Sequence, residues 1–434
     1  MKKLLLFLVL SVFAFNGFSQ KVKHVVMISV DGFRPDFYLD TAWHTVTMHS
    51  LMQQGTYARG VNSVFPSMTY PSHTTIVTGV QPLQHGVYYN AMFEPTGSTG
   101  KIYWNDSSIK APTLWTAAKK KGLTTAALFW PVSADAPVAY NIPDIGSMGE
   151  AIRAQYSKPA GFIDEVKTEI FNSAAKIEYG KNTNIAQIAA YVIGKAQPNL
   201  MAVHFFAVDH AEHLQGRNGE MVKEAVADAD SGIAIIINAL KNAGIWESTV
   251  LLVVGDHGFV DVKTTVSPNV WLKEAGLAND IKKDDWKAQF NSVGGSSYLY
   301  LKNHDQQTLD AVKKILAQLP ESKRKLFAVM DRKKLNQIGA NPEVALALTG
   351  LNGAAFNNAF TGEDIKPGHG GTHGYFPDFR EIQTGFIAYG PGIRKGGVIP
   401  EMNLRDIAPA VAKILGLDLP SAKGHIPAVL FSGK

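Results

Sequence analysis

The sequence predicts an α/β fold in which a doubly wound, mainly parallel β-sheet carries helices on both faces. Two observations lead to this fold class. Short apolar runs alternate with amphipathic helical stretches along the 434 residues, which is the order expected of parallel strands with crossover helices. The runs are apolar on nearly every residue, as in the HVVMISV of His24–Val30, so we expect strands buried on both faces. Ligands of such sheets bind beyond the carboxyl ends of the strands, where the candidates for function lie.

The chain begins with a predicted signal peptide over residues 1–20. Lys2 and Lys3 precede the largely apolar run LLLFLVLSVFAF, and a short polar exit follows. A transmembrane anchor is the alternative, but the run is shorter than the ~20 residues that span a bilayer. We therefore expect cleavage, export as a periplasmic or secreted protein, and no stable membrane anchor.

Five strands and four helices are predicted for the main sheet. The strands are expected at His24–Val30, Leu123–Phe129, Leu200–Phe206, Thr249–Val254 and Gln383–Tyr389. The helices are expected at Thr113–Lys121, Asn182–Lys195, Met221–Lys241 and Asn403–Leu415. Glycines soon after three of these helices provide stop signals.

Residues 266–362 have a different pattern, which predicts a smaller α+β cap inserted into a catalytic core of residues 21–265 and 363–434. Ser296–Leu301 alternates like an exposed strand, and Gln306–Gln318 has the pattern of a helix. Glu343–Leu348 is a further strand candidate.

The amino-acid composition limits which nucleophiles, cross-links and metal ligands the chain can use. The chain has no cysteine, which excludes a disulfide framework, a thiolate nucleophile, a zinc knuckle and an iron–sulfur cluster. Any metal must then be held by His, Asp, Glu or other oxygen ligands. The net charge of +5 is small for this length, so no nucleic-acid-binding surface is expected.

Clusters of acidic and histidine residues accompany four of the predicted strands. An aspartate after a strand can also cap a turn, which is the simpler explanation for any one cluster alone. Four clusters at one sheet edge supply three carboxylates and at least three imidazoles, enough for two divalent ions. The clusters are Asp31-Gly32, the run from Asp209 to His213, Asp256-His257, and the run from His369 to His373.

The segment Phe65–His73, FPSMTYPSH, predicts the start of a short helix. Pro71 suits the first turn, with Thr69 or Tyr70 near the N-cap. Backbone N–H groups at a helix start attract anions, so a hydroxyl there could attack phosphorus while a metal ion lowers its pKa. Thr69 could instead serve only as a cap, and spacing alone leaves as rivals Ser67, Ser72, Thr74 and Thr75.

These motifs, in this order, resemble the nucleotide pyrophosphatase/phosphodiesterase family of the alkaline phosphatase superfamily. The matching segments extend from His24 to about Gly416. They are Asp31-Gly32, FPSMTYPSH, TGVQPLQHGVYYN, FWPVS, VDHAEHLQG, VVGDHGF and GTHGYFPD. The resemblance implies an alkaline-phosphatase-like fold and a two-metal hydrolase that cleaves phosphodiester or pyrophosphate bonds through a covalent phospho-threonine.

The resemblance also implies roles for single positions. Thr69 matches the nucleophile, and Asn90 matches an amide that donates to a nonbridging phosphate oxygen. The implied cofactors are two Zn²⁺ ions, with other divalent metals as alternatives. One zinc would be held by Asp31, Thr69, Asp256 and His257, and the other by Asp209, His213 and His373.

Several residues near Asp209 bear on the choice of metal ligands and on the shape of the pocket. His213 is preferred to His210 as a ligand, because it lies four residues after Asp209 and can share one face of a helical turn. His204, inside a strand, is expected to be a core histidine. Family members often carry Glu-Pro before the aspartate where this chain has Ala207-Val208, which could alter the pocket wall.

The expected substrate is a small phosphodiester of the nucleotide or lipid-headgroup type. Monoesterases usually meet the extra phosphate charge with Arg or Lys, and the chain has neither from Gly122 to Ile152. The alternatives are a phosphomonoesterase, a phosphonoacetate-type hydrolase, or an exported pseudoenzyme that binds metal or phosphate. Aromatic candidates for contacting a base or a choline are Phe93, Trp104, Trp130, Tyr140 and Tyr375.

Overall fold

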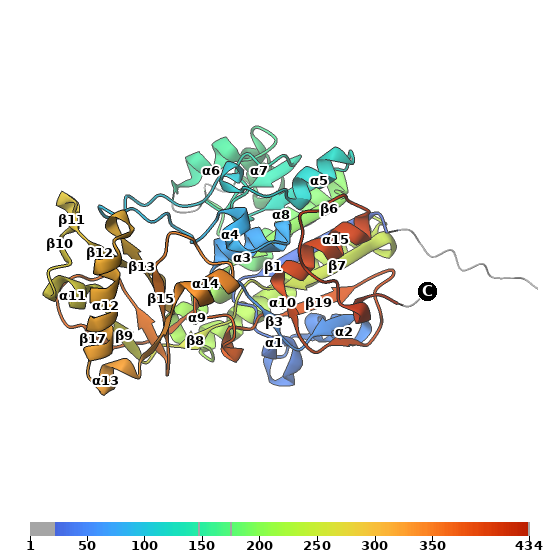
Figure 1. Cartoon of the computed structure of the whole chain (residues 1–434). Helices are drawn as coiled ribbons and strands as arrows, with labels where there is room; N and C mark the ends of the chain where they lie inside the picture. The colour runs from blue at the N-terminus through green and yellow to red at the C-terminus, as the bar shows by residue number, and fades with distance from the viewer. Residues whose placement is uncertain (1–21, 146–147, 174–175, 433–434) are drawn as a thin grey trace, which may run out of the picture.

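An eight-stranded sheet organises the chain, whose computed structural model describes residues 22–145, 148–173 and 176–432 (Figure 1). The predicted signal peptide lies outside the described residues. The order across the sheet is β20 (Gly397–Ile399), β2 (Thr56–Ala58), β19 (Phe386–Tyr389), β7 (Thr249–Val254), β1 (His24–Val30), β6 (Leu200–Phe205), β4 (Thr125–Leu128) and β5 (Tyr140–Ile142).

Five neighbouring strands, from β7 to β5, are parallel. An exception is β19, the third strand from one edge, which runs antiparallel to both β7 and β2. The sheet is thus mainly parallel, as predicted. All five predicted strands are present, although Gln383–Tyr389 is shortened at its start because residues 380–382 form a 3-10 turn.

Helices cover both faces of the main sheet, because successive side chains of β1 point to opposite faces and are apolar on both. Val26, Ile28 and Val30 belong to the hydrophobic cluster of one face, whereas Val25 and Met27 belong to the other. The first face is covered by α2 (Val46–Gln54), α7 (Phe162–Phe171), α8 (Asn182–Ala196) and α10 (Glu220–Asn242). The second is covered by α3 (Thr69–Thr78), α5 (Leu114–Lys120) and α15 (Ile407–Leu415).

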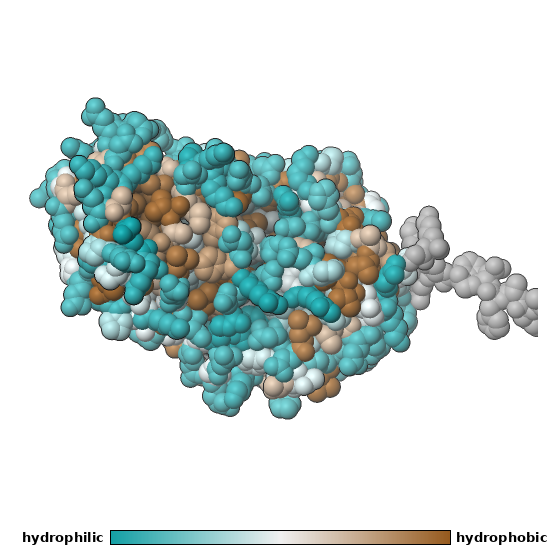
Figure 2. Space-filling view, turned by 60° about the horizontal axis from the view of Figure 1, so that its bottom comes forward, coloured by the Kyte–Doolittle hydropathy of each residue, from teal (hydrophilic) through white to brown (hydrophobic). Residues whose placement is uncertain are grey.

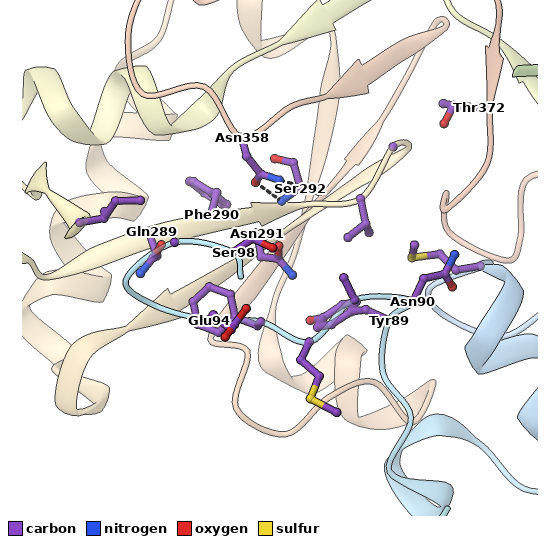
Figure 3. Close-up of a pocket in the computed structure, with 18 of the residues that line it drawn as sticks. Tyr89, Asn90, Glu94, Ser98, Gln289, Phe290, Asn291, Ser292, Asn358 and Thr372 are labelled. Carbon is purple, nitrogen blue, oxygen red and sulfur yellow. Dashed lines mark hydrogen bonds between the residues drawn. The ribbon is translucent and has the colours of Figure 1, made fainter. Parts of the chain in front are cut away.

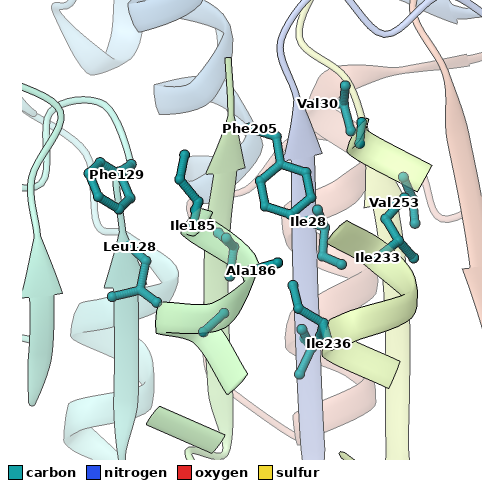
Figure 4. Packing of buried hydrophobic residues seen from close by; sticks show 14 of the residues in the cluster. Ile28, Val30, Leu128, Phe129, Ile185, Ala186, Phe205, Ile233, Ile236 and Val253 are labelled. Carbon is teal, nitrogen blue, oxygen red and sulfur yellow. The ribbon is translucent and has the colours of Figure 1, made fainter. Parts of the chain in front are cut away.

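The close packing of the first face fixes the strands that lead to the site (Figure 4). Ile28 of β1 and Phe205 of β6 lie beside the apolar stripes of α8 and α10, with side chains that are fully buried. Each fully buried aliphatic side chain contributes about 1.5–3 kcal/mol through burial. The predicted helices at Asn182–Lys195 and Met221–Lys241 are therefore confirmed to within a residue at each end.

Residues 266–362, which we call the cap, form a second sheet at one end of the molecule, at the left of Figure 1. Its order is β12 (Ala288–Ser292), β13 (Ser296–Leu301), β15 (Leu346–Gly350) and β14 (Phe327–Met330). The cap helices are α11 (Pro268–Glu274), α12 (Gln306–Gln318), α13 (Glu321–Arg324) and α14 (Arg332–Gln337).

The expectation that Ser296–Leu301 is an exposed strand was wrong, because every residue of β13 is buried. Leu299 and Leu301 pack into the hydrophobic cluster of the cap. Tyr298 and Tyr300 pack on the opposite face, where the cap meets the core, and the Tyr300 hydroxyl lies 2.9 Å from that of Tyr89. Amphiphilic tyrosines on an alternating strand therefore marked an interface between cap and core.

The described part of the chain contains no helix with the length and apolar character of a membrane span.

Candidate active site

Three adjacent strands bring the predicted acidic residues to one edge of the sheet. Asp31 follows β1, Asp256 follows β7, and Asp209 lies in the first turn of α9 (Ala207–Gln215) after β6. The order β7-β1-β6 makes these neighbours, since parallel strands end at the same edge.

The first group of potential ligands comprises Asp31, Asp256 and His257. Their ligand atoms all lie within 4.8 Å of one another. His257 Nε2 is 3.2 Å from Asp31 Oδ1 and 3.1 Å from Asp256 Oδ2. All three residues are buried, and the Gly32 backbone N–H donates to Asp256 Oδ1 at 3.2 Å, which orients that carboxylate.

The second group lies beside the first and is centred on Asp209. Its Oδ1 atom is 3.4 Å from His213 Nε2 and 3.6 Å from His373 Nε2. The Nδ1 atoms of these histidines donate to the carbonyl oxygens of Gly371 and Ser67, so Nε2 faces the group in both cases. His257 stacks on His373, with ring centroids 3.7 Å apart, and joins the two groups.

Burial disfavours the charged forms of these carboxylate and imidazole side chains when no cation is bound between them. It raises the pKa values of Asp31 and Asp256 well above the usual range, with repulsion between acidic neighbours as a further cause. Burial also lowers the pKa of His257 well below its usual range and that of His373 to about 3, with neighbouring histidines adding to the shifts.

Several buried polar atoms of the two groups have no hydrogen-bond partner and could serve as ligands of divalent cations. Asp31 Oδ1, Asp209 Oδ1, Asp256 Oδ2 and His257 Nε2 are buried without a hydrogen-bond partner and face one another. Buried unsatisfied groups cost about 1–3 kcal/mol each, and more when charged. A mixed set of imidazole and carboxylate ligands with unused lone pairs is the chemistry that zinc and similar metals prefer.

Thr69 is the first residue of α3 and lines the same cavity as Asp31 and Asp209. The N-cap is Met68, one residue earlier than predicted, and Pro71 lies in the first turn as expected. Thr69 Oγ1 has no side-chain hydrogen bond within the described part of the chain. The four rival hydroxyls are all engaged, with Ser67 bonded to Tyr375 O, Ser72 to Ser63, Thr74 to Tyr70 O, and Thr75 to His85.

Asn90 faces the start of the same helix. The backbone N–H of Tyr70 donates to Asn90 Oδ1 at 2.9 Å, which leaves the Nδ2 amine as the donor available to a ligand. The structure thus brings every residue of the predicted site to one place at the sheet edge, while their chemical roles remain proposals.

Two buried histidines near this group were not predicted to take part. His204 of β6 bonds the Phe129 carbonyl oxygen through Nδ1 and lies 3.0 Å from Asp31 Oδ2 through Nε2. It is a core histidine, as expected, but it also orients a candidate ligand. His73 bonds Ser29 Oγ and the Thr69 carbonyl oxygen, and its Nδ1 atom lies 3.7 Å from Asp256. The sequence did contain one indication that His204 lies near the site: it is in β6, and the candidate ligand Asp209 follows that strand.

A cavity of about 830 Å³, which we call the reaction pocket, opens in front of Thr69. Its aromatic lining is Tyr70 and Phe206 rather than any of the five aromatics singled out from the sequence. Trp130 and Tyr375 are buried: Trp130 packs in the hydrophobic cluster of the second sheet face, and the Tyr375 hydroxyl donates to the Ala354 carbonyl oxygen at 2.9 Å. Other polar lining residues are Asp144, Lys181, His210, Glu224 and Asp228.

A second cavity of about 580 Å³, which we call the cap groove, lies between the core and the cap (Figure 3). One wall comes from residues 89–98 of the core and the other from β12 and the residues after it. His213, His373 and Asn90 line its inner end. In Figure 2, apolar surface is visible toward the cap end and again near the opposite end of the molecule, with hydrophilic residues around both.

Comparison with known proteins gives a family match over residues 25–375, described as type I phosphodiesterase / nucleotide pyrophosphatase. The human ectonucleotide pyrophosphatase/phosphodiesterase family member 1 is 24% identical over 86% of the chain, which spans 37% of that protein. The human family member 5 is 23% identical over 91% of the chain and is covered to 74% of its length. A venom phosphodiesterase of Naja atra is 24% identical over 88% of the chain, which spans 42% of that protein.

Solved structures support the same fold. Murine ectonucleotide pyrophosphatase/phosphodiesterase 5, as an inactive threonine-to-alanine variant in complex with AMP, superposes with a TM-score of 0.69 at 21% identity. The superposition covers 93% of this chain and 97% of the murine one. At this identity the likeness shows the fold, which agrees with the predicted alkaline-phosphatase-like α/β architecture.

Proposed function

The chain belongs to the type I phosphodiesterase / nucleotide pyrophosphatase family, and on this premise we propose that it cleaves its substrate through a covalent phospho-threonine on Thr69, with two divalent cations. Enzymes of this family are phosphoric diester hydrolases, and that class applies to the chain. The observation that carries the finer proposal is the convergence of orphaned, buried ligand atoms beside an unengaged threonine hydroxyl at a helix start.

Seven side chains would hold the cations. Asp31, Asp256 and His257, with the Thr69 hydroxyl, would bind one ion, and Asp209, His213 and His373 the other. We expect zinc, since both sets mix imidazole with carboxylate. Bound there, the ions would supply Lewis acidity to the phosphoryl oxygens and favour the ionised form of the Thr69 hydroxyl.

Thr69 then acts as the nucleophile. Its Oγ1 atom attacks phosphorus, and the new Oγ1–P bond forms as the bond from phosphorus to the leaving alcohol breaks. The leaving oxygen takes a proton from solvent. Water next attacks the phospho-threonine, which releases a phosphomonoester and restores the hydroxyl. An inactive threonine-to-alanine variant of the murine relative supports a nucleophile of this type.

Asn90 would stabilise the charge that develops during both steps. Its Oδ1 atom is held by Tyr70, so the Nδ2 donor is oriented before substrate arrives. The N-terminal end of α3 adds the partial positive charge of its backbone N–H groups at the same place.

The charge of the reaction pocket favours a diester over a monoester. A monoester brings a second negative charge, which Arg or Lys would have to meet. The described lining contains no arginine, and its lysine, Lys181, pairs with Glu178 at 2.8 Å. Asp144, Glu224 and Asp228 make the lining acidic and would repel a dianion.

We further propose a small-molecule diester of the nucleotide or lipid-headgroup type as substrate, and export of the enzyme to the periplasm or the medium. The AMP bound to the murine relative supports a nucleotide as one candidate. The predicted signal peptide supports export.

The decisive experiment compares turnover of bis-p-nitrophenyl phosphate and p-nitrophenyl phosphate, with metal analysis, for the wild type, Thr69→Ala and Thr69→Ser. The wild type is expected to bind zinc and to prefer the diester. Thr69→Ala should lose activity by at least about 1,000-fold, because the nucleophile is gone. Thr69→Ser keeps a hydroxyl and serves as the matched control, which should retain part of the activity.

Acid-quenched enzyme should also carry on Thr69 a phosphoryl group that retains one p-nitrophenyl substituent, detectable by mass spectrometry. Full diesterase activity in Thr69→Ala, or a purified wild type that binds no metal, would contradict the mechanism. A zinc-loaded wild type without any turnover would favour the pseudoenzyme, and faster monoester turnover would favour a phosphomonoesterase.

A further inference from the structure

The reaction pocket and the cap groove meet at Asn90, which lines both cavities. The reaction pocket contains Thr69, while the cap groove ends against His213 and His373, on the far side of the second ligand group. A phosphodiester has two substituents on one phosphorus atom. With phosphorus beside Thr69 and Asn90, one substituent can occupy each cavity.

Away from its inner end, where His213 and His373 would hold a cation, the cap groove has no cationic side chain in its described lining. The lining contains neither lysine nor arginine, and its acidic side chain is Glu94, which Lys101 Nζ approaches to 3.8 Å from outside the lining. Hydrogen bonds from the backbone and hydroxyl of Thr99 lower the pKa of Glu94, so the carboxylate stays ionised. A diphosphate or another anionic substituent that extends past the inner end would approach the Glu94 carboxylate and find no lysine or arginine in the lining to pair with.

Uncharged hydrogen-bonding groups and aromatic rings make up most of the remaining lining. Amide side chains come from Asn90, Gln289, Asn291 and Asn358, and hydroxyls from Ser98, Ser292 and Thr372. In Figure 3, Asn291 lies in the middle of the groove near Ser98. Its half-buried side-chain amide has no hydrogen-bond partner in the described part of the chain, so it is available to a ligand.

The walls of the groove are fixed before any ligand binds. Asn358 and Ser292 exchange two hydrogen bonds, of 2.7 and 3.0 Å, across the cap wall. Gln289 Nε2 donates to the Pro95 carbonyl oxygen at 2.8 Å and ties the cap to the core loop. The ring of Phe93 stacks on Tyr300 at 3.7 Å, which makes a flat apolar surface beside the amides.

We propose that the cap groove receives the second substituent of the phosphodiester and selects an uncharged polyhydroxylated group, such as glycerol or a sugar ring. Hydroxyls of such a group can both donate to and accept from the amide of Asn291, and its carbon skeleton can pack on Phe93. The volume of about 580 Å³ is large enough for a group of this size. This inference rests on the proposed diesterase activity and names the substrate class for it.

Three p-nitrophenyl diesters test the inference, because all release the same chromophore. The first carries glycerol as the second substituent. The second carries glycerate, in which a carboxylate replaces one hydroxymethyl group. The third carries methyl, which is too small to reach Asn291. Zinc-loaded wild type should show a kcat/KM at least about tenfold higher for the glycerol diester than for the glycerate diester.

Substitutions at Asn291 should move this preference. Asn291→Ala should lower kcat/KM for the glycerol diester by about tenfold and leave the methyl diester unchanged. Asn291→Lys adds a cation to the groove and should reverse the preference toward glycerate. Asn279→Ala, which removes an exposed amide elsewhere on the cap, is the matched control and should change none of the three rates.

Each result has a defined meaning. Equal wild-type rates for the glycerol and glycerate diesters would overturn the inference and leave the diesterase activity standing. An Asn291→Ala variant that slows the methyl diester equally would overturn it as well. If the variants do not fold, the wild-type preference alone decides. Absence of turnover for all three diesters would overturn the proposed function, and the inference with it.

Discussion

At the scale of single residues, Asn90 lines both cavities and contacts the first turn of α3, the helix that begins with Thr69. One hydrogen bond from the Tyr70 backbone N–H to Oδ1 leaves the Nδ2 end of the amide available to the proposed phosphate site. The neutral Nδ2 donor can stabilise developing negative charge without contributing a ligand to either metal group. Its loss should therefore change the rate rather than the metal content.

We predict that Asn90→Ala lowers kcat for a diester by about 100-fold, the usual cost of removing one donor to a developing oxyanion. Asn90→Asp should be slower still, because a carboxylate repels the phosphate and cannot donate. Steady-state kinetics with zinc analysis check both variants. A variant that loses its zinc, or one with the wild-type rate, would contradict the assigned role.

Asp106, on the turn at Asp106–Ser108, gives a prediction about pH. Burial is the main cause that raises its pKa to about 6, and Oδ1 is buried without a hydrogen bond. A folded-state pKa above the unfolded value near 3.9 means that the stability contributed below pH ~4 is lost as the pH rises through about 6.

Asp106→Asn should therefore raise the free energy of unfolding at pH 7.5 by about 1 kcal/mol, after allowance for solvent screening of a partly exposed group. At pH 3 the two proteins should be equally stable, because Asp106 is then largely protonated in both the folded and the unfolded state. Urea unfolding at the two pH values measures this, with Asp310→Asn, an exposed change on α12, as the control. A stabilisation that is the same at both pH values would show that the charge is not responsible.

The sequence predicted site residues that follow strands but missed residues that support them. Asp31, Asp209 and Asp256 could be found because parallel strands end at one edge. The role of His204 depends on which strands are neighbours in space, and that of His73 depends on how α3 packs against β1, neither of which the local sequence encodes. Likewise, residue spacing alone could not distinguish the hydroxyl of Thr69 from its four rivals, whereas their hydrogen-bond partners in the structure do.

At the scale of elements, α9 is attached to the loop after β1 by a buried ion pair. Arg34 Nε lies 3.3 Å from Glu212 Oε1, and both side chains are almost fully buried. Gly32, at φ +75°, allows the close approach, because a Cβ there would lie 2.6 Å from Glu212 Oε2. Since Asp209 and His213 are on α9, this pair positions the second ligand group against the first.

Removing Glu212 should be costly, since the buried Arg34 would keep only its 2.9 Å contact with the partly exposed Asp36. We predict that Glu212→Ala lowers the free energy of unfolding by about 3 kcal/mol. The double variant Arg34→Met with Glu212→Leu should recover part of the loss. Denaturant unfolding measures both, and Glu178→Ala, which breaks the exposed pair with Lys181, should change stability by less than about 0.5 kcal/mol. Equal effects of the buried and exposed substitutions would contradict this account.

Element boundaries were predicted well where one physical signal dominated. Apolar β-branched runs located β1 and β7 to the residue, and amphipathic patterns located α8 and α10. The buried state of β13 was missed because its polar and aromatic residues pack against the core, a partner that lies far away in the sequence.

At the scale of the whole molecule, the α/β architecture followed from the order of elements, but the cap groove did not. The groove exists only because residues 89–98 meet β12 across almost two hundred residues of chain. The alternating pattern of a strand indicates that the strand has two different faces. It does not indicate which part of the molecule packs against each face. The fold class was thus readable from local patterns, whereas the shape of the substrate site required the assembled structure.

The metal groups couple the site to the stability of the whole chain. Asp31 and Asp256 are buried side by side, so the fold bears their repulsion unless cations neutralise it. Chelation at pH 7.5 should therefore lower the melting temperature, by the equivalent of about 3 kcal/mol if the metal had been present at 100 times its Kd.

A single substitution should invert the order of stability. Asp256→Asn removes one of the two adjacent carboxylates, so without metal it should melt at a higher temperature than the wild type. With zinc present it should melt at a lower temperature, because one ligand is lost and the ion binds less tightly. Thermal unfolding of both proteins with zinc and with chelator measures the four values. If Asp256→Asn is the more stable protein under both conditions, Asp256 is not a metal ligand; if the wild type is the more stable one under both, the adjacent carboxylates do not destabilise the metal-free fold.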